Sequence, residues 1–135
     1  MKQKILTKKI VNTDRAPSPV GPYNQSVVAS GAMVFVSGQI ALDPATNTLV
    51  LTSIEEETDR VMKNVEAVLQ ANDCTLADVV FCSVFVKNMD HYSRVNEVYG
   101  SYFDDETAPT RALVEVSRLP KDVNVEISAI AVKTL

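Results

Sequence analysis

The chain has 135 residues, which fits one domain over residues 1–135, and 46% of them are hydrophobic, which argues against a disordered chain. Thirteen basic and seventeen acidic side chains give a net charge of −4, so the chain has no general attraction to a polyanion and nucleic-acid binding is not expected. No apolar run approaches the roughly 20 residues of a membrane span.

The chain begins MKQKILTKKIV, which is basic but lacks the apolar centre of roughly 7–15 residues that a secretory signal needs. Its two cysteines, Cys74 and Cys82, form no CxxC pair, and we expect free thiols in a reducing compartment. These features favour a cytoplasmic location, and they leave open a weak organellar targeting signal.

The first third of the chain shows strand and turn patterns followed by a helix signal. Two Val-rich runs flank Gly31 and predict the two strands of a hairpin. Residues 43–48, DPATNT, have the composition of a turn. Ser53 and Glu56 then fit a capping box, which predicts a helix of about five turns that ends near Asn72.

Further elements follow at regular intervals. Residues 79–87 predict a strand that is apolar on both faces. Asp90 can cap a second helix, whose apolar stripe contains Tyr92, Val95, Tyr99 and Tyr102. The runs RALVEVS and VNVEISAIAV predict two final strands joined by RLPKD.

This order predicts an α+β fold with one mixed sheet. Two strand–helix–strand crossovers of the usual right-handed sense place both helices on the same face of that sheet. The strands carry Val and Ile on both sides, and the chain has no further helices to cover the second face. A second copy of the same chain is the simplest cover, so the sequence predicts an oligomer.

Several kinds of catalytic site are not expected. The sequence has no Gly-rich phosphate loop and no Ser or Cys in the setting of a nucleophile elbow. Its single histidine, His91, falls at a predicted helix start, where a solvated side chain is the ordinary role. One histidine alone makes neither a metal site nor a catalytic triad. A metal-, nucleotide- or PLP-dependent enzyme is therefore not expected.

Two charged residues interrupt the apolar C-terminal strands. Arg111 opens the first strand and Glu126 lies within the second. If these strands pair through RLPKD, the two side chains become near neighbours. They could form an exposed salt bridge worth ~0–1 kcal/mol. Alternatively, the arginine could bind an anion beside a carboxylate that handles a proton or orients a water.

Other polar residues are candidates for a ligand pocket. The segment PSPVGPYNQS, residues 17–26, presents Tyr23 from a loop that is rigid because of its prolines. Ser37 and Gly38 fall within a strand, where a glycine leaves room for another backbone or a ligand to approach. Asn96 lies beside the tyrosine stripe of the second helix. Each of these residues also has an ordinary structural role in a turn, a strand or a helix contact.

Taken together, these motifs resemble the RidA family, also called YjgF. The resemblance rests on GPYNQ, VSGQI, SVFVKNMDHYSRVNEVY, PTR and VEVSRLPKDVNVEISAIAV, in this order over nearly the whole chain. It implies a chorismate-mutase-like fold, related to the ferredoxin-like arrangement. It also implies a homotrimer with a barrel-like core and a ligand pocket at each subunit interface.

The resemblance further implies an activity. RidA proteins hydrolyse 2-aminoacrylate and 2-aminocrotonate as their imines, 2-iminopropanoate and 2-iminobutanoate, to 2-oxo acids and ammonia without a cofactor or metal. PLP-dependent serine and threonine dehydratases release these compounds. By the same resemblance, Arg111 grips the substrate carboxylate and Glu126 handles the attacking water. Further pocket positions are Tyr23, Ser37, Gly38, Asn96 and Leu113.

This sequence departs from the family pattern at a few positions. Thr110 stands where many members have alanine, and Leu113 stands where some have cysteine, so only the backbone carbonyl of Leu113 could bind substrate. The acidic segment 104–108 could reshape the rim of the pocket. Two alternatives to the deaminase stay open, namely a non-enzymatic binding protein or chaperone, and a ribonuclease or translation inhibitor.

Overall fold

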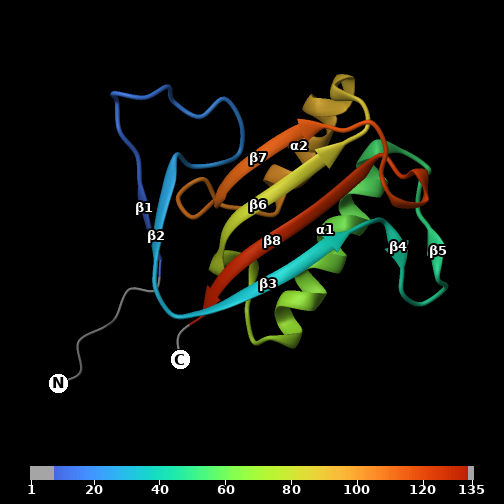
Figure 1. Cartoon of the computed structure of the whole chain (residues 1–135), viewed down its shortest axis with the longest axis horizontal. Coiled ribbons are helices and arrows are strands. Elements are labelled where there is room, and N and C mark those ends of the chain that lie inside the picture. The colour runs from blue at the N-terminus through green and yellow to red at the C-terminus, as the bar shows by residue number, and fades with distance from the viewer. Residues whose placement is uncertain (1–7, 134–135) are drawn as a thin grey trace.

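The computed structural model describes residues 8–133, and its centre is a four-stranded mixed sheet in the order β3-β8-β6-β7 (Figure 1). Strands β6 and β7 run parallel, and β8 runs antiparallel to both of its neighbours. The strands of this sheet are β3 (Ala32–Gln39), β6 (Val79–Val86), β7 (Thr110–Glu115) and β8 (Val125–Lys133).

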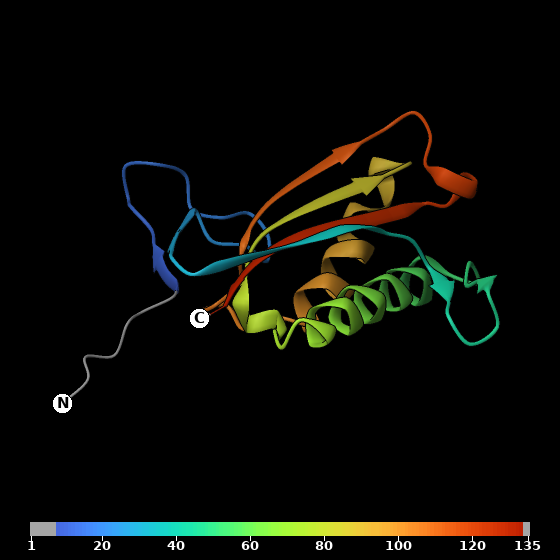
Figure 2. The same cartoon turned by 60° about the horizontal axis from the view of Figure 1, so that its bottom comes forward.

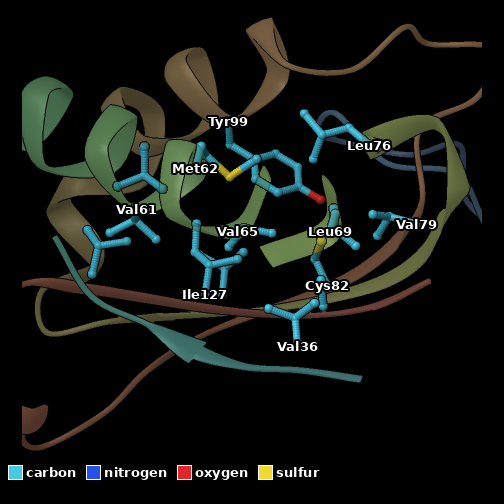
Figure 3. Close-up of a cluster of buried hydrophobic side chains, with 14 of the residues drawn as sticks. Val36, Val61, Met62, Val65, Leu69, Leu76, Val79, Cys82, Tyr99 and Ile127 are labelled. Atoms are coloured by element: carbon cyan, nitrogen blue, oxygen red, sulfur yellow. The ribbon is translucent and has the colours of Figure 1, made fainter. Parts of the chain in front are cut away.

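Both long helices lie on one face of this sheet, which confirms the predicted layering (Figure 2). Helix α1 spans Ile54–Ala71 and helix α2 spans Tyr92–Ser101. The core fills the space between helices and sheet (Figure 3). Side chains that are fully buried there include Val61, Met62, Val65, Leu69, Val84, Tyr99 and Ile127.

The signals at the start of α1 are largely confirmed. The Ser53 hydroxyl accepts a hydrogen bond from the Glu56 backbone N–H at 3.0 Å, and the helix ends before Asn72. The Glu56 carboxylate, however, accepts from the Thr52 hydroxyl. In a full capping box it would accept from the backbone N–H of Ser53.

The prediction that Asp90 caps α2 is wrong. The Asn88 side chain accepts from the Asp90 N–H at 2.9 Å and caps a 3₁₀ turn, η2 (Met89–His91), which leads into α2. Asn88 is therefore the cap at this point of the chain, and Asp90 is exposed.

The predicted hairpin around Gly31 does not form. Strand β2 (Ser26–Ala29) pairs with β1 (Lys8–Val11), whereas β3 pairs with β8. Gly31 does turn the chain, with φ of +132°, and an added Cβ there would lie 2.4 Å from the Lys133 carbonyl oxygen. Pairing with β8 places Val34 and Val36 beside alanines of β8 under the helices, and that shared burial decides the partner.

The predicted pairing of β7 with β8 is also wrong, because β6 lies between them. The connection passes the end of β6, where Val116 N–H donates to the Val86 carbonyl at 2.9 Å and Lys87 N–H donates to the Asn124 carbonyl at 3.0 Å. It contains the 3₁₀ turn η3 (Pro120–Asp122), in which Lys121 and Asp122 have positive φ.

Smaller elements complete the fold. The DPATNT turn is confirmed and joins β4 (Leu42–Asp43) to β5 (Thr48–Leu49). A 3₁₀ turn, η1 (Leu76–Asp78), precedes β6. Between residues 8 and 133, no helix has both the length and the hydropathy to cross a membrane.

The sheet face away from the helices carries large exposed hydrophobic side chains. Phe35 and Met33 of β3 are 69% and 57% exposed, and Val114 of β7 is 45% exposed. Burying apolar surface of this kind is worth about 25 cal/mol per Å². An uncovered second face was predicted from the sequence, and it is present in the single chain.

Candidate functional site

Arg111 lies near the start of β7 and points toward the helices. Its partner in the ladder is Cys82 of β6, whose side chain is buried beneath α2. One guanidinium nitrogen, Nη1, donates to Oδ1 of Asn96 at 2.5 Å. Because Asn96 projects from α2, the contact joins the edge strand to the helix layer and fixes the plane of the guanidinium.

Three tyrosine rings surround the same guanidinium. Its Cζ atom lies 5.4 Å from the ring centroid of Tyr23, 5.9 Å from that of Tyr92 and 5.1 Å from that of Tyr99. Cations are attracted to aromatic faces at such distances, typically by ~0.5–1 kcal/mol at exposed sites and more when desolvated. The rings therefore hold the arginine without neutralising its charge.

The loop that carries Tyr23 is docked by its neighbour Asn24. The buried Asn24 amide donates to the carbonyl oxygens of Asp105 and Ala108 at 2.9 and 2.8 Å. An added Cβ on Gly21 would come within 3.1 Å of Arg111 Nη2. The loop therefore approaches the guanidinium closely, and the acidic segment 104–108 supports it.

The floor of this group is apolar. Tyr99 is fully buried, and Figure 3 shows its ring among the core side chains. Its hydroxyl has no hydrogen-bond partner in the described part of the chain, and burial raises its pKa. Burial likewise raises the pKa of the Cys82 thiol to about 11. Both groups are therefore neutral at physiological pH, and Arg111 is the charged group among these side chains.

Arg111 has no carboxylate partner among residues 8–133. The ion pairs there are Lys63–Asp59, Arg94–Glu55 and Arg118–Asp122. The salt bridge between Arg111 and Glu126, which was one of the two alternatives from the sequence, is therefore not formed within the single chain.

Ser37, Gly38 and Glu126 form a second group on the open face of the sheet. Ser37 is exposed on β3, in line with Phe35. An added Cβ at Gly38 would lie 2.8 Å from both Cδ and Oε2 of Glu126, so the carboxyl group occupies the space that glycine leaves. The sequence predicted that a backbone or a ligand approaches Gly38, and within the single chain the Glu126 side chain takes that place.

The structure does not bring Arg111 and Glu126 together within one chain. Arg111 shares a ladder row with Cys82, whereas Glu126 lies opposite Phe85, three residues further along β6. Successive side chains of a strand alternate between faces, so an odd offset puts the two residues on opposite sides. The predicted closeness was wrong because it rested on a β7–β8 hairpin.

The remaining candidate residues lie on β7 and at the end of η2. Leu113 is half-buried on β7 and packs against the core. The Thr110 hydroxyl donates to the Val80 carbonyl at 2.7 Å, so it supports the strand. His91 is half-buried at the end of η2, not solvated as expected, and its Nδ1 has no partner among residues 8–133. Among the described residues, no three or more His, Cys, Asp or Glu side chains lie together in a cluster that could hold a metal ion.

Sequence reasoning did not count Tyr92, Tyr99 or Asn24 among the site residues, although the two tyrosines lie around Arg111 and Asn24 docks the loop of Tyr23. A signal for the tyrosines was present, because Tyr92 and Tyr99 share one helical face with Asn96. No sequence pattern distinguishes Asn24 from an ordinary turn residue, since its partners are carbonyls some eighty positions away.

Comparison with known proteins places these features in a wider group. The family model described as Endoribonuclease L-PSP matches residues 13–133. A RutC family protein of Synechocystis is 50% identical over 94% of this chain and 98% of its own length. TdcF of Escherichia coli, provisionally named a reactive intermediate deaminase, is 41% identical over 94% of this chain and 98% of its own.

Solved structures show the same fold. A crystal structure of Escherichia coli TdcF with bound serine has a TM-score of 0.72 at 41% identity, and it covers 93% of this chain and 99% of that one. The YjgF gene product of Escherichia coli has a TM-score of 0.71 at 38% identity, with coverage of 93% and 98%.

Proposed function

Because the chain belongs to the RidA (YjgF) family, we propose that it hydrolyses reactive 2-imino acids to 2-oxo acids and ammonia. The proposed substrates are 2-iminopropanoate and 2-iminobutanoate, which a PLP-dependent serine or threonine dehydratase would supply. The chain would act in the same compartment as that dehydratase, the cytoplasm being our expectation, and it would need no cofactor.

One observation carries this proposal. Arg111 is held by Asn96 and three tyrosine rings, and within residues 8–133 no carboxylate neutralises it. A guanidinium offers a planar fork that matches a carboxylate with two parallel hydrogen bonds. Arg111 therefore suits the carboxylate of a small 2-imino acid. TdcF, the relative whose crystal structure contains serine, binds a small molecule that also carries a carboxylate.

In the proposed reaction the carboxylate is fixed first. Binding to Arg111 then holds the electrophilic C=N carbon in place for one water molecule. Water adds to that carbon, and the C–N bond then breaks to release ammonia and leave the 2-oxo acid. Glu126 would orient the water and move protons toward the leaving nitrogen.

Glu126 must come from a second subunit in this mechanism. In one chain it lies on the opposite face of the sheet from Arg111. We propose a homotrimer in which the exposed Phe35 and Met33 are covered and the Glu126 of one copy reaches the Arg111 of the next. The pocket would then be completed at each interface, with Tyr23, Ser37, Gly38, Asn96 and Leu113 as further walls.

Two alternatives are weaker. The description of the family model suggests a ribonuclease, but the net charge of −4 opposes RNA and the single histidine gives no acid–base pair. A protein that only binds 2-oxo acids would need Arg111 but has no need for a carboxylate at Glu126.

The test couples the purified protein to a serine or threonine dehydratase and follows imine decay by absorbance, with semicarbazide as the trap for surviving imine. The wild-type protein should accelerate the decay and suppress semicarbazone formation. Glu126→Gln should keep 2-oxo acid binding but slow hydrolysis. A wild-type protein that leaves the decay rate unchanged would refute the deaminase proposal.

A further inference from the structure

Glu57 is a carboxylate buried where no cation neutralises it. It lies in the first turns of α1, and its side chain is 0% exposed. None of the ion pairs among residues 8–133 includes it. Burying an unpaired carboxylate is costly unless hydrogen bonds satisfy its oxygens, so the presence of one in the core requires an explanation.

Three N–H groups from one short segment satisfy this carboxylate. Oε2 accepts from the backbone N–H of Asn124 at 2.7 Å and from that of Val125 at 2.9 Å. Oε1 accepts from the side-chain amide of Asn124 at 2.8 Å. The N-terminal position on α1 also favours a negative charge. All three contacts are made to the two residues that directly precede Glu126.

The same segment is held from its other side. The Asn124 carbonyl accepts from the Lys87 N–H at the end of β6. The preceding turn η3 contains two residues with positive φ, so the chain enters β8 from an irregular connection. Glu57 and Lys87 together fix where β8 begins. A shift by one residue there would exchange the faces of Val125 and Glu126.

We propose that Glu57 is a positioning residue that fixes the Glu126 carboxyl group on the open face of the sheet. It acts through the sheet: Val125 is buried toward the helices, and the next side chain, Glu126, lies against Gly38 on the other face. Glu57 does not touch substrate. This inference rests on the proposed function for its effect on turnover, but the anchoring itself can be measured without substrate.

The experiment compares four variants of the full-length protein. Glu57→Leu removes all three acceptor contacts. Glu57→Gln keeps one oxygen for the two backbone N–H groups but turns an amide NH₂ toward Asn124. Adding Asn124→Asp to Glu57→Gln restores the hydrogen bond at that contact, because the introduced glutamine amide can then donate to the introduced aspartate carboxylate. Val65→Ala, two turns further along α1, truncates a fully buried side chain of the core and leaves the Glu57 contacts in place, so it serves as the stability control.

Glu57→Leu should lower kcat for imine hydrolysis about 10- to 100-fold, since a displacement near 1 Å of a catalytic group costs this much. Binding of 2-oxobutanoate should stay within about twofold, because Arg111 is untouched. Val65→Ala should lower Tm while kcat, measured well below Tm, stays near wild type. The double variant should recover most of the turnover lost in Glu57→Gln.

Two measurements are independent of activity. Hydrogen exchange at the Val125 amide should accelerate in Glu57→Leu, and the ¹³C carboxyl signal of Glu126, assigned with Glu126→Gln, should shift. If the wild-type protein fails to hydrolyse imines, the function proposal fails, and these two signals alone decide the anchoring.

The inference is overturned if Glu57→Leu leaves kcat or the Glu126 signal unchanged, or if Val65→Ala lowers kcat as much at equal loss of Tm. If Glu57→Leu does not fold, Glu57→Gln and its double variant decide, and an absence of rescue by Asn124→Asp refutes the role.

Discussion

Arg111 and Glu126 lie on opposite faces of one sheet. On the shared neighbour β6, Arg111 pairs with Cys82 and Glu126 pairs with Phe85, three residues further along. A single chain therefore holds two halves of the proposed site that cannot meet each other. This arrangement makes the deaminase proposal testable at the level of the assembly.

Mixed assemblies should regain activity from two impaired variants. Arg111→Ala and Glu126→Gln should each be strongly impaired alone, but a shared interface can combine the intact Arg111 of one copy with the intact Glu126 of another. In a random mixture about a quarter of the interfaces would be intact, so about a quarter of the wild-type rate is expected after co-refolding. Recovery of less than a few per cent would show that the two residues do not share a site.

Loss of Arg111 should damage binding more than stability. A bidentate charge-assisted contact lies near the upper end of ~1.5–3 kcal/mol, so Arg111→Ala should lower kcat/KM by about 10²-fold or more. Arg111→Lys should recover little, because an ammonium cannot reproduce the planar fork. Steady-state kinetics and the Tm of both variants measure the two effects. Normal turnover with a large loss of Tm would assign Arg111 a purely structural role.

Gly38→Ala should displace the Glu126 carboxyl group. The added methyl group would lie 2.8 Å from Glu126 Cδ, and a flexible side chain can rotate away from it. We therefore expect a change of less than about 1 kcal/mol in the free energy of unfolding but at least a tenfold loss of kcat, with 2-oxo acid binding retained.

A charge at Phe35 should prevent assembly. Its side chain is 69% exposed on the open face in the single chain and would be buried between copies in the proposed trimer. Phe35→Asp should therefore give a monomer in sedimentation velocity and light scattering at micromolar concentration, with little imine hydrolysis. A wild-type monomer under the same conditions would refute the trimer, and with it the shared pocket.

The Cys82 thiol should resist alkylation in the folded protein. Burial raises its pKa from the ordinary 9.0 to about 11, so at pH 8 almost no thiolate is present. The unfolded chain loses this proton near pH 9 and the folded chain only near pH 11, so the folded state binds more protons in between. The free energy of unfolding should thus fall between pH 9 and 11, and this slope should be smaller in Cys82→Ala. Rapid labelling by iodoacetamide at pH 8 without denaturant would contradict the assignment.

The sequence by itself determined the elements that depend on local interactions. The Ser53 cap and the apolar spacing defined α1 almost to the residue, because caps and helical periodicity involve positions at most four apart. The crossover order likewise fixed both helices on one face. The residues of the candidate site could also be picked out, since Arg111 and Glu126 are charges within apolar strands.

Strand partners were decided only by the tertiary structure. Alternation along a strand shows which side chains share a face, but it carries no information about the neighbouring strand. Both predicted hairpins failed for this reason: β3 and β6 take β8 between them because the three strands together bury Val36, Val84 and Ile127 under the helices. That placement separates Arg111 from Glu126, and it brings Glu57 of α1 to the start of β8, a contact across 67 positions that no local pattern encodes.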